Sequence, residues 1–302
     1  MRRIAHAADI QYCPKHLKWV DLAFSSFVSD AITKGCDAAV IAGDSFDSSM
    51  GIHEPAVSAY IKQVVRLASA MPTLILQGTY SHDRLGCLDV LKQVPTSYPI
   101  YIADKPVQVL LQAGEWYQGG EITANTIADG DALFSCLPSL NKADPKIMAS
   151  GAKAAVSALA EQWAPNNEAA RAAGIATVLV SHGTVNGCAT ESGYAMVSPD
   201  HEFDASVLYA FGADAVMLGH IHAFQSWSDG AQTIAYPGSV ARLVHGDHNP
   251  KGYLNWKIAA GKPDFDFFEL PSRQLLEIDY DGPPDIEELT TLAARADDNT
   301  YV

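Results

Sequence analysis

The stretch Val40-Ile41-Ala42-Gly43-Asp44-Ser45-Phe46-Asp47 decides how the rest of the chain is interpreted. Its apolar residues predict a short buried strand, and the Gly-Asp pair puts the Asp44 carboxylate at the strand's C-terminal end. In open α/β sheets, ligands bind at that edge. Taken alone, Asp44 is better explained as a helix cap or a turn residue, as most Asp residues after strands are.

Four more groups of polar residues follow apolar runs in the same way. They are Asp9 with Gln11, the run Ser81-His82-Asp83, the single His182, and His220 with His222. The C-terminal ends of parallel strands meet at one edge of a sheet, so we expect these groups to lie together with Asp44. This repetition reverses the interpretation of Asp44, which we predict to be a carboxylate that bridges two metal ions.

The order of the elements predicts an α/β fold with parallel strand pairing and right-handed crossovers. Expected strands cover residues 4–8, 38–42, 73–77, 175–181 and 215–218, and expected helices cover 17–34, 55–70 and 204–212. Residues 100–138 read as short strands and turns, and 146–173 as one or two surface helices broken near Pro165. After His222 the pattern becomes all-β (224–227, 233–236, 253–258 and 265–269), for which we expect antiparallel strands.

Size and composition describe a globular protein with one large domain, or one domain and a small appendage. The chain has 302 residues, 48% of them hydrophobic and 18% charged. Its net charge of −15 excludes a generally basic nucleic-acid-binding surface. DNA is still a possible substrate, because bound divalent cations would add positive charge among the carboxylates.

The cysteines and the N-terminus indicate the compartment. Five scattered cysteines without a C-x-x-C pair favour a reducing environment and argue against a structural zinc site. His6 and Asp9 interrupt what would have to be the apolar part of a signal peptide. No apolar stretch is long enough to span a bilayer, so we predict a cytoplasmic protein without a membrane partner.

Carboxylate with imidazole is the ligand set of manganese, iron or zinc. Two such ions, about 3.5–4 Å apart, can polarise a phosphoryl group and generate a hydroxide nucleophile. His220 and His222 point the same way in an extended segment, so either each serves one metal or both serve one. A lone buried histidine is more often a core residue, which is how we interpret His6, His16 and His53, and the loop histidines are His245 and His248.

The series Asp9, Gly43-Asp44, Gly78 with His82-Asp83, His182 and Gly219-His220-Ile221-His222 resembles the calcineurin-like metallophosphoesterase superfamily. Within it, Tyr236-Pro237-Gly238-Ser239-Val240-Ala241-Arg242 and Pro250-Lys251-Gly252-Tyr253 resemble the SbcD-type DNA repair nucleases. The similarity covers roughly residues 3–280, and Gly-Thr-x-Ser-His-Asp is similar to forms in phage-type relatives.

The resemblance implies a four-layer α/β/β/α sandwich with a di-metal site at the strand tips. The metal is usually Mn²⁺, with Mg²⁺, Fe²⁺ or Zn²⁺ as alternatives. By position, Asp9, Asp44 and His222 would hold one metal, and Asp44, His182 and His220 the other. His82 would assist the leaving group without binding metal, and Asp83 would orient its ring.

Two positions depart from the family pattern. Gln11 replaces the histidine of Asp-x-His and offers a neutral oxygen, so the first metal should be held more weakly, with His16 as the nearest substitute. Ser81 stands where the Asn of Gly-Asn-His-Asp would be, after two added residues, and is a weak ligand. Near the site, Arg84, Arg242 and Lys251 are candidate phosphate contacts.

The implied activity is phosphodiester hydrolysis of DNA by a hydroxide activated between two metals. The implied partners are an SbcC-type coiled-coil ATPase and a second copy of the chain in a homodimer. We expect a nuclease domain over residues 1–270, and a linker with the start of a truncated or vestigial capping domain over 271–302. The alternatives are a general phosphoesterase acting on nucleotides or phosphoproteins, and a degenerate, non-catalytic scaffold for an ATPase.

Overall fold

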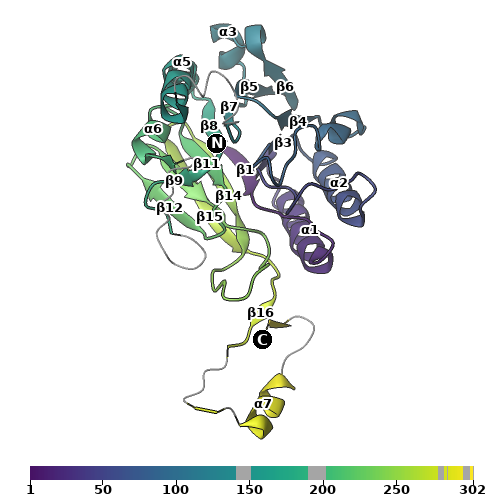
Figure 1. Ribbon diagram of the computed structural model, residues 1–302. Coiled ribbons are helices and arrows are strands. Elements are labelled where there is room, and N and C mark those ends of the chain that lie inside the picture. Colours follow the sequence, from purple (N-terminus) through teal and green to yellow (C-terminus); the bar gives the residue numbers. More distant parts are fainter. Residues whose placement is uncertain (141–150, 190–201, 278–281, 284, 295–299, 302) are drawn as a thin grey trace.

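The computed structural model of the protein describes residues 1–140, 151–189, 202–277, 282–283, 285–294 and 300–301. Within these residues two β-sheets lie face to face, and helices cover the outer face of each sheet (Figure 1). Apolar side chains fill the three interfaces between the layers. The fold is therefore the four-layer α/β/β/α sandwich that the sequence predicts.

The first sheet has the strand order β15-β14-β1-β2-β3-β4. Strands β1 to β4 pair in parallel, whereas β14 is antiparallel to β1 and β15 to β14. Helices α1 (Leu17–Thr33) and α2 (Pro55–Ala68) follow β1 and β2 and pack on the outer face. The strands are β1 (Arg2–Ala7), β2 (Ala38–Ala42), β3 (Thr73–Leu76), β4 (Ile100–Ala103), β14 (Gly252–Ala259) and β15 (Lys262–Glu269).

The second sheet has the order β12-β13-β11-β8-β7-β5-β6. Its strands are β5 (Val107–Gln112), β6 (Glu115–Gln118), β7 (Ala132–Leu137), β8 (Ala176–His182), β11 (Ala215–Gly219), β12 (Gln225–Ser228) and β13 (Thr233–Tyr236). The expectation of antiparallel strands after His222 holds for β12, β14 and β15, whereas β13 is antiparallel to β12 but parallel to β11. Helices α5 (Ala152–Ala172) and α6 (Ala205–Tyr209) cover this sheet.

Helix α5 is continuous, so the predicted break near Pro165 is wrong. A proline inside a helix removes one backbone hydrogen bond and costs about 3 kcal/mol. Packing on both sides of Pro165 offsets this cost, because Trp163 and Asn167 are buried. The Asn167 side chain also donates to the carbonyl of Phe211 over 2.7 Å.

The short elements connect and extend the sandwich. They are the 3₁₀ turns η1 (Asp89–Gln93) and η2 (Gly119–Glu121), helix α3 (Ala124–Ala128), and the paired β9 (Thr184–Val185) and β10 (Glu202–Phe203). At the C-terminal end, β16 (Gln274–Leu275) pairs with β17 (Thr300–Tyr301), and α7 (Ile286–Ala293) lies between them in sequence. Residues 190–201, between β9 and β10, lie outside the described residues.

Two expectations about the chemistry of the whole chain can be compared with the structure. All five cysteines are free thiols. In the described part of the chain, no helix combines the length and the apolar character needed to cross a bilayer.

Candidate metal centre

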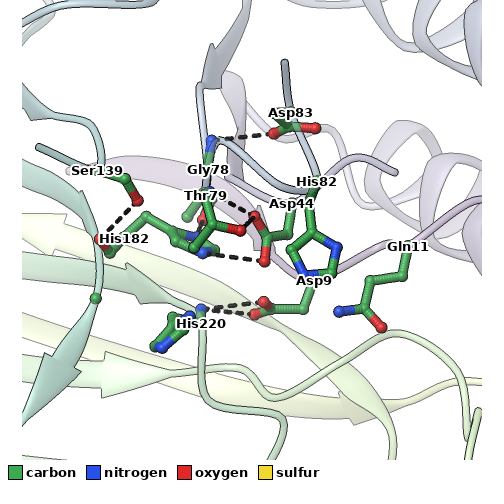
Figure 2. A network of polar contacts seen from close by, with 12 residues as sticks. Asp9, Gln11, Asp44, Gly78, Thr79, His82, Asp83, Ser139, His182 and His220 are labelled. Carbon is green, nitrogen blue, oxygen red and sulfur yellow. Dashed lines mark hydrogen bonds and ion pairs between the residues drawn. The ribbon is translucent and has the colours of Figure 1, made fainter. Parts of the chain in front are cut away.

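The candidate site lies where β1, β2 and β3 of the first sheet end beside β8 and β11 of the second (Figure 2). Several of its residues have a left-handed backbone, with φ of 50° at Asp9, 54° at Gln11, 52° at Asp44 and 102° at His220. Among the described non-glycine residues, Ala113 is the one other case. Such a backbone costs roughly 1–3 kcal/mol per residue and persists where the surrounding structure imposes it.

Two glycines make room for these side chains. A Cβ atom at Gly43 would lie 2.2 Å from Nδ1 of His182, and one at Gly78 would lie 2.1 Å from Oδ1 of Asp44. Real Cβ atoms essentially never lie this close to another non-bonded heavy atom. The glycines of the quoted Gly-Asp pair and of the β3 exit are therefore required for the site to form.

Asp44 is the centre of the cluster, and three groups fix its buried carboxylate. Oδ1 accepts hydrogen bonds from the backbone N–H of Thr79 (2.7 Å) and from its hydroxyl (3.0 Å). Oδ2 lies 3.2 Å from Nε2 of His182. Burial raises the Asp44 pKa, but His182, His82 and Thr79 outweigh it, so that the pKa falls well below its usual range. Asp44 is an anion in the folded protein.

The orientation of His182 points to a cation in front of Asp44. Its Nδ1 lies 2.7 Å from the carbonyl of Ala42, so Nδ1 carries a proton that it donates there. Nε2 is then buried and faces the Asp44 carboxylate, and the described residues give it no contact other than this ion pair. Burial alone would lower the His182 pKa, but the negative charges of Asp44 and Asp9 outweigh this effect and raise the pKa to about 9. The position therefore favours positive charge at Nε2, from a proton or a metal ion.

Three side chains that could bind a metal ion meet at this point. Asp44, His182 and His220 each offer a ligand atom, and these atoms lie within 4.8 Å of one another. The rings of His182 and His220 are 5.2 Å apart between centroids. One carboxylate and two imidazoles suit manganese, iron or zinc. The residues present therefore fit a divalent cation of this kind.

The second half of the site contains Asp9, Gln11 and His222. Asp9 is buried, and both of its oxygens accept from the backbone N–H of His220, over 3.1 and 2.9 Å. Nε2 of His222 is 3.8 Å from Oδ1 of Asp9 and 3.1 Å from the amide nitrogen of Gln11. Burial raises the pKa of Asp9 above its usual value. The Gln11 side chain, which we predict to be a weak metal ligand, thus contacts the ring of His222.

The pair His82-Asp83 differs from its predicted arrangement. The Asp83 carboxylate accepts from the backbone N–H groups of Ser45 (3.0 Å) and Gly78 (3.0 Å) and does not orient the His82 ring. Nδ1 of His82 instead lies 3.2 Å from the carbonyl of Phe46. Burial and the nearby Asp44 raise the pKa of Asp83 to about 7. Asp83 therefore joins the β2 and β3 exits, and the predicted orienting role is wrong.

Three predicted side chains remain outside the cluster. Ser81 is exposed, whereas Thr79, directly after Gly78, contacts Asp44. Sequence reasoning missed Thr79, although its place next to Gly78 is where the family has Asn. The Arg242 guanidinium donates to the carbonyls of Asp247 and Asn249 (2.6 and 3.2 Å) and also to that of Arg273, and its role as a phosphate contact stays a prediction. Arg84 is exposed, and its role stays a prediction.

Known proteins share this fold but little sequence. No protein family and no curated protein matches the chain. Among solved structures, GAP50, described as the anchor in the inner membrane complex of Plasmodium, is 13% identical with a TM-score of 0.52, covering 100% of this chain and 96% of that one. A dimetal phosphatase from Danio rerio is 9% identical with a TM-score of 0.51, covering 89% and 99%. The chain thus shares the four-layer α/β/β/α fold of these two proteins.

Proposed function

We propose that this protein is a metal-dependent phosphodiesterase whose substrate is DNA. The observation that carries the proposal is the cluster of Asp44, His182 and His220, whose ligand atoms lie within 4.8 Å of one another at the strand ends. The buried Nε2 of His182, which lies 3.2 Å from the Asp44 carboxylate, adds to it. A dimetal phosphatase of the same fold is consistent with this chemistry.

The residues divide into two ligand groups and one proton donor. Asp44, His182 and His220 would hold one divalent cation, and Asp9, Asp44 and His222 would hold the second, with Mn²⁺ as the cation that the family resemblance implies. When bound, such cations polarise a phosphoryl oxygen and lower the pKa of water. Nδ1 of His82 is held by Phe46, which leaves Nε2 to donate a proton to the departing sugar oxygen.

DNA as the substrate is supported by the sequence motifs around Ser239 and Lys251, which resemble those of SbcD-type nucleases. The same resemblance supports an SbcC-type ATPase as partner and a homodimer. With a net charge of −15, the isolated chain should bind DNA weakly and only with divalent cations. DNA affinity that persists in EDTA would contradict this part of the proposal.

Two other functions are compatible with the fold, which does not determine the substrate. A general phosphoesterase is favoured by the structural similarity to a dimetal phosphatase. A non-catalytic scaffold is favoured by Gln11, which replaces a ring ligand, and by the exposed Ser81. GAP50, whose description is that of an anchor, has the same fold.

The decisive experiment measures hydrolysis of linear double-stranded and single-stranded DNA with Mn²⁺, beside bis(p-nitrophenyl) phosphate and the His82→Ala variant. Manganese-dependent cleavage of DNA that the variant loses would support the nuclease. Turnover of the small diester alone would favour the general phosphoesterase. Inactivity on both substrates, together with no binding of Mn²⁺, would favour the scaffold.

A further inference from the structure

A buried lysine, Lys251, contacts the backbone carbonyl of His222 in the candidate metal centre. Lys251 immediately precedes β14, and its side chain is 0% exposed. Its ammonium forms an ion pair with the buried Asp247 and donates to the hydroxyl of Ser239 (3.0 Å) and to the carbonyl of His222 (2.9 Å). An ammonium group has three donors, and these three acceptors satisfy them all.

Stability alone does not explain this arrangement. Burying two charges costs several kcal/mol per ion, and apolar residues of similar volume often replace a buried ion pair without loss. A buried ion pair is instead useful where it holds a segment of the chain in one conformation. Here the Lys251 ammonium binds the carbonyl of His222, so the segment that it holds is the backbone at His222.

The two motifs that resemble SbcD-type nucleases, residues 236–242 and 250–253, both contact the carbonyl of His222. From the first motif, the backbone N–H of Ser239 donates to His222 O over 3.3 Å. Gly238, at φ 79°, lets the chain approach, since a Cβ there would lie 2.8 Å from the same oxygen. From the second motif comes the ammonium of Lys251. Ser239 also forms a β-bridge with Ala8, the residue before Asp9.

His222 needs such an anchor because no strand holds it. His182 is the last residue of β8 and pairs in register with Gly219 of β11. His222 lies three residues beyond the end of β11, and its side chain is 22% exposed. The network of Lys251, Asp247 and Ser239 replaces the missing strand and connects His222 to the end of β1.

We propose that Lys251, held by Asp247 and Ser239, is a positioning residue that sets the metal site formed by Asp9 and His222. It acts through the backbone of His222 and does not contact the metal. This inference rests on the proposed function only in requiring a second cation at that site. It replaces the expectation that Lys251 contacts a substrate phosphate, because the buried ammonium has no donor left for one.

The test counts Mn²⁺ ions and their affinities by electron paramagnetic resonance of free Mn²⁺, without any substrate. The variant Lys251→Met/Asp247→Asn removes both charges, and Asn can still accept the hydrogen bond from the backbone of Asn249. We expect the tighter ion to bind as in the wild type and the weaker ion to lose roughly 10- to 100-fold in affinity, the usual effect of groups that orient ligands.

Two further variants keep the test decisive. Arg171→Met breaks the ion pair with the buried Asp214 at the other end of β8 and should lower the melting temperature while leaving both Mn²⁺ affinities unchanged. Ser239→Ala, the variant to use if the double variant does not fold, should weaken the second ion several-fold. Two ions bound with wild-type affinities in either site variant, or a single ion in the wild type, would overturn the inference. A wild type that binds two ions but does not cleave DNA would contradict the proposed substrate alone.

Discussion

The two halves of the candidate metal centre are built differently. Asp44 lies two residues after the end of the buried strand β2, and His182 is the last residue of the buried strand β8; their side chains are 3% and 0% exposed. His222 lies in the segment after β11 and is held through its carbonyl by Lys251. One half is thus fixed by the sheets themselves, and the other by side chains that come from loops.

This difference predicts unequal affinity. In the strand-held half, Nε2 of His182 already lies 3.2 Å from the Asp44 carboxylate, so both ligand groups face the same point. In the loop-held half, the amide nitrogen of Gln11 lies 3.1 Å from Nε2 of His222 and donates to the lone pair that a metal would use. We therefore expect the first cation to bind at Asp44, His182 and His220, and the second to bind more weakly at Asp9 and His222.

The largest effect is expected for Asp44→Asn, which removes the carboxylate common to both halves. Loss of several kcal/mol of charge stabilisation corresponds to hydrolysis on the order of 10³-fold slower. Asn can still accept from the N–H of Thr79, so the fold should persist. The matched control is Asp37→Asn, before the opposite end of β2, which should retain full activity. Equal losses in both variants would show that Asp44 acts through stability.

His82→Ala should slow DNA hydrolysis roughly 10²- to 10⁴-fold, the usual contribution of a positioned acid. Both Mn²⁺ affinities should stay unchanged, because His82 belongs to neither ligand group. The loss should be much smaller on bis(p-nitrophenyl) phosphate, whose leaving group departs without a proton. Equal losses on the two substrates, measured as kcat, would exclude proton donation.

Gln11→His should make the two halves more alike. Replacing the amide removes the N–H donor that competes for Nε2 of His222 and adds a ring nitrogen, so the affinity for the second Mn²⁺ should rise by roughly 10-fold. Gln11→Asn tolerates the left-handed backbone but is too short to reach His222 in the same way, so it serves as the control without this gain. A titration of Mn²⁺ followed by electron paramagnetic resonance distinguishes the two variants. An unchanged second affinity in Gln11→His would refute the competition by the amide.

The smallest effect is expected for Thr79→Val, which removes one hydroxyl from the strand-held half. The lost hydrogen bond to Asp44 should lower the free energy of unfolding by about 1 kcal/mol and weaken the first Mn²⁺ a few-fold. Thr79→Ser keeps the hydroxyl and should resemble the wild type. If valine and serine behave alike in urea unfolding and metal titration, the hydroxyl has no such role.

The sequence predicts the layers of the fold and the identity of the clustered ligands because both depend on local patterns. Apolar runs such as 38–42 identify the strands, and the polar residues after them identify one sheet edge. Hydrogen-bond partners depend on tertiary structure. The Arg242 guanidinium donates hydrogen bonds to the backbone carbonyls of Asp247, Asn249 and Arg273. The spacing of these residues in the sequence does not predict that they lie together.

Helix α5 and the Asp83 side chain illustrate the same limit. A proline usually interrupts a helix, but the buried Trp163 and Asn167 keep α5 continuous, and burial cannot be read from composition. An Asp next to a histidine is typical of an orienting pair. Here the backbone of Ser45 and Gly78 binds the carboxylate instead, because the exits of β2 and β3 lie side by side.

The left-handed backbone at Asp9, Gln11, Asp44 and His220 has a consequence for directed evolution. Glycine adopts this conformation without strain, so glycine at any of these positions should relieve part of a cost of roughly 1–2 kcal/mol. A library of variants screened only for heat resistance would therefore be enriched in substitutions that delete metal ligands. A second screen for bound Mn²⁺ would retain the variants that keep these side chains. Thermal tolerance and metal content therefore have to be selected together in this protein.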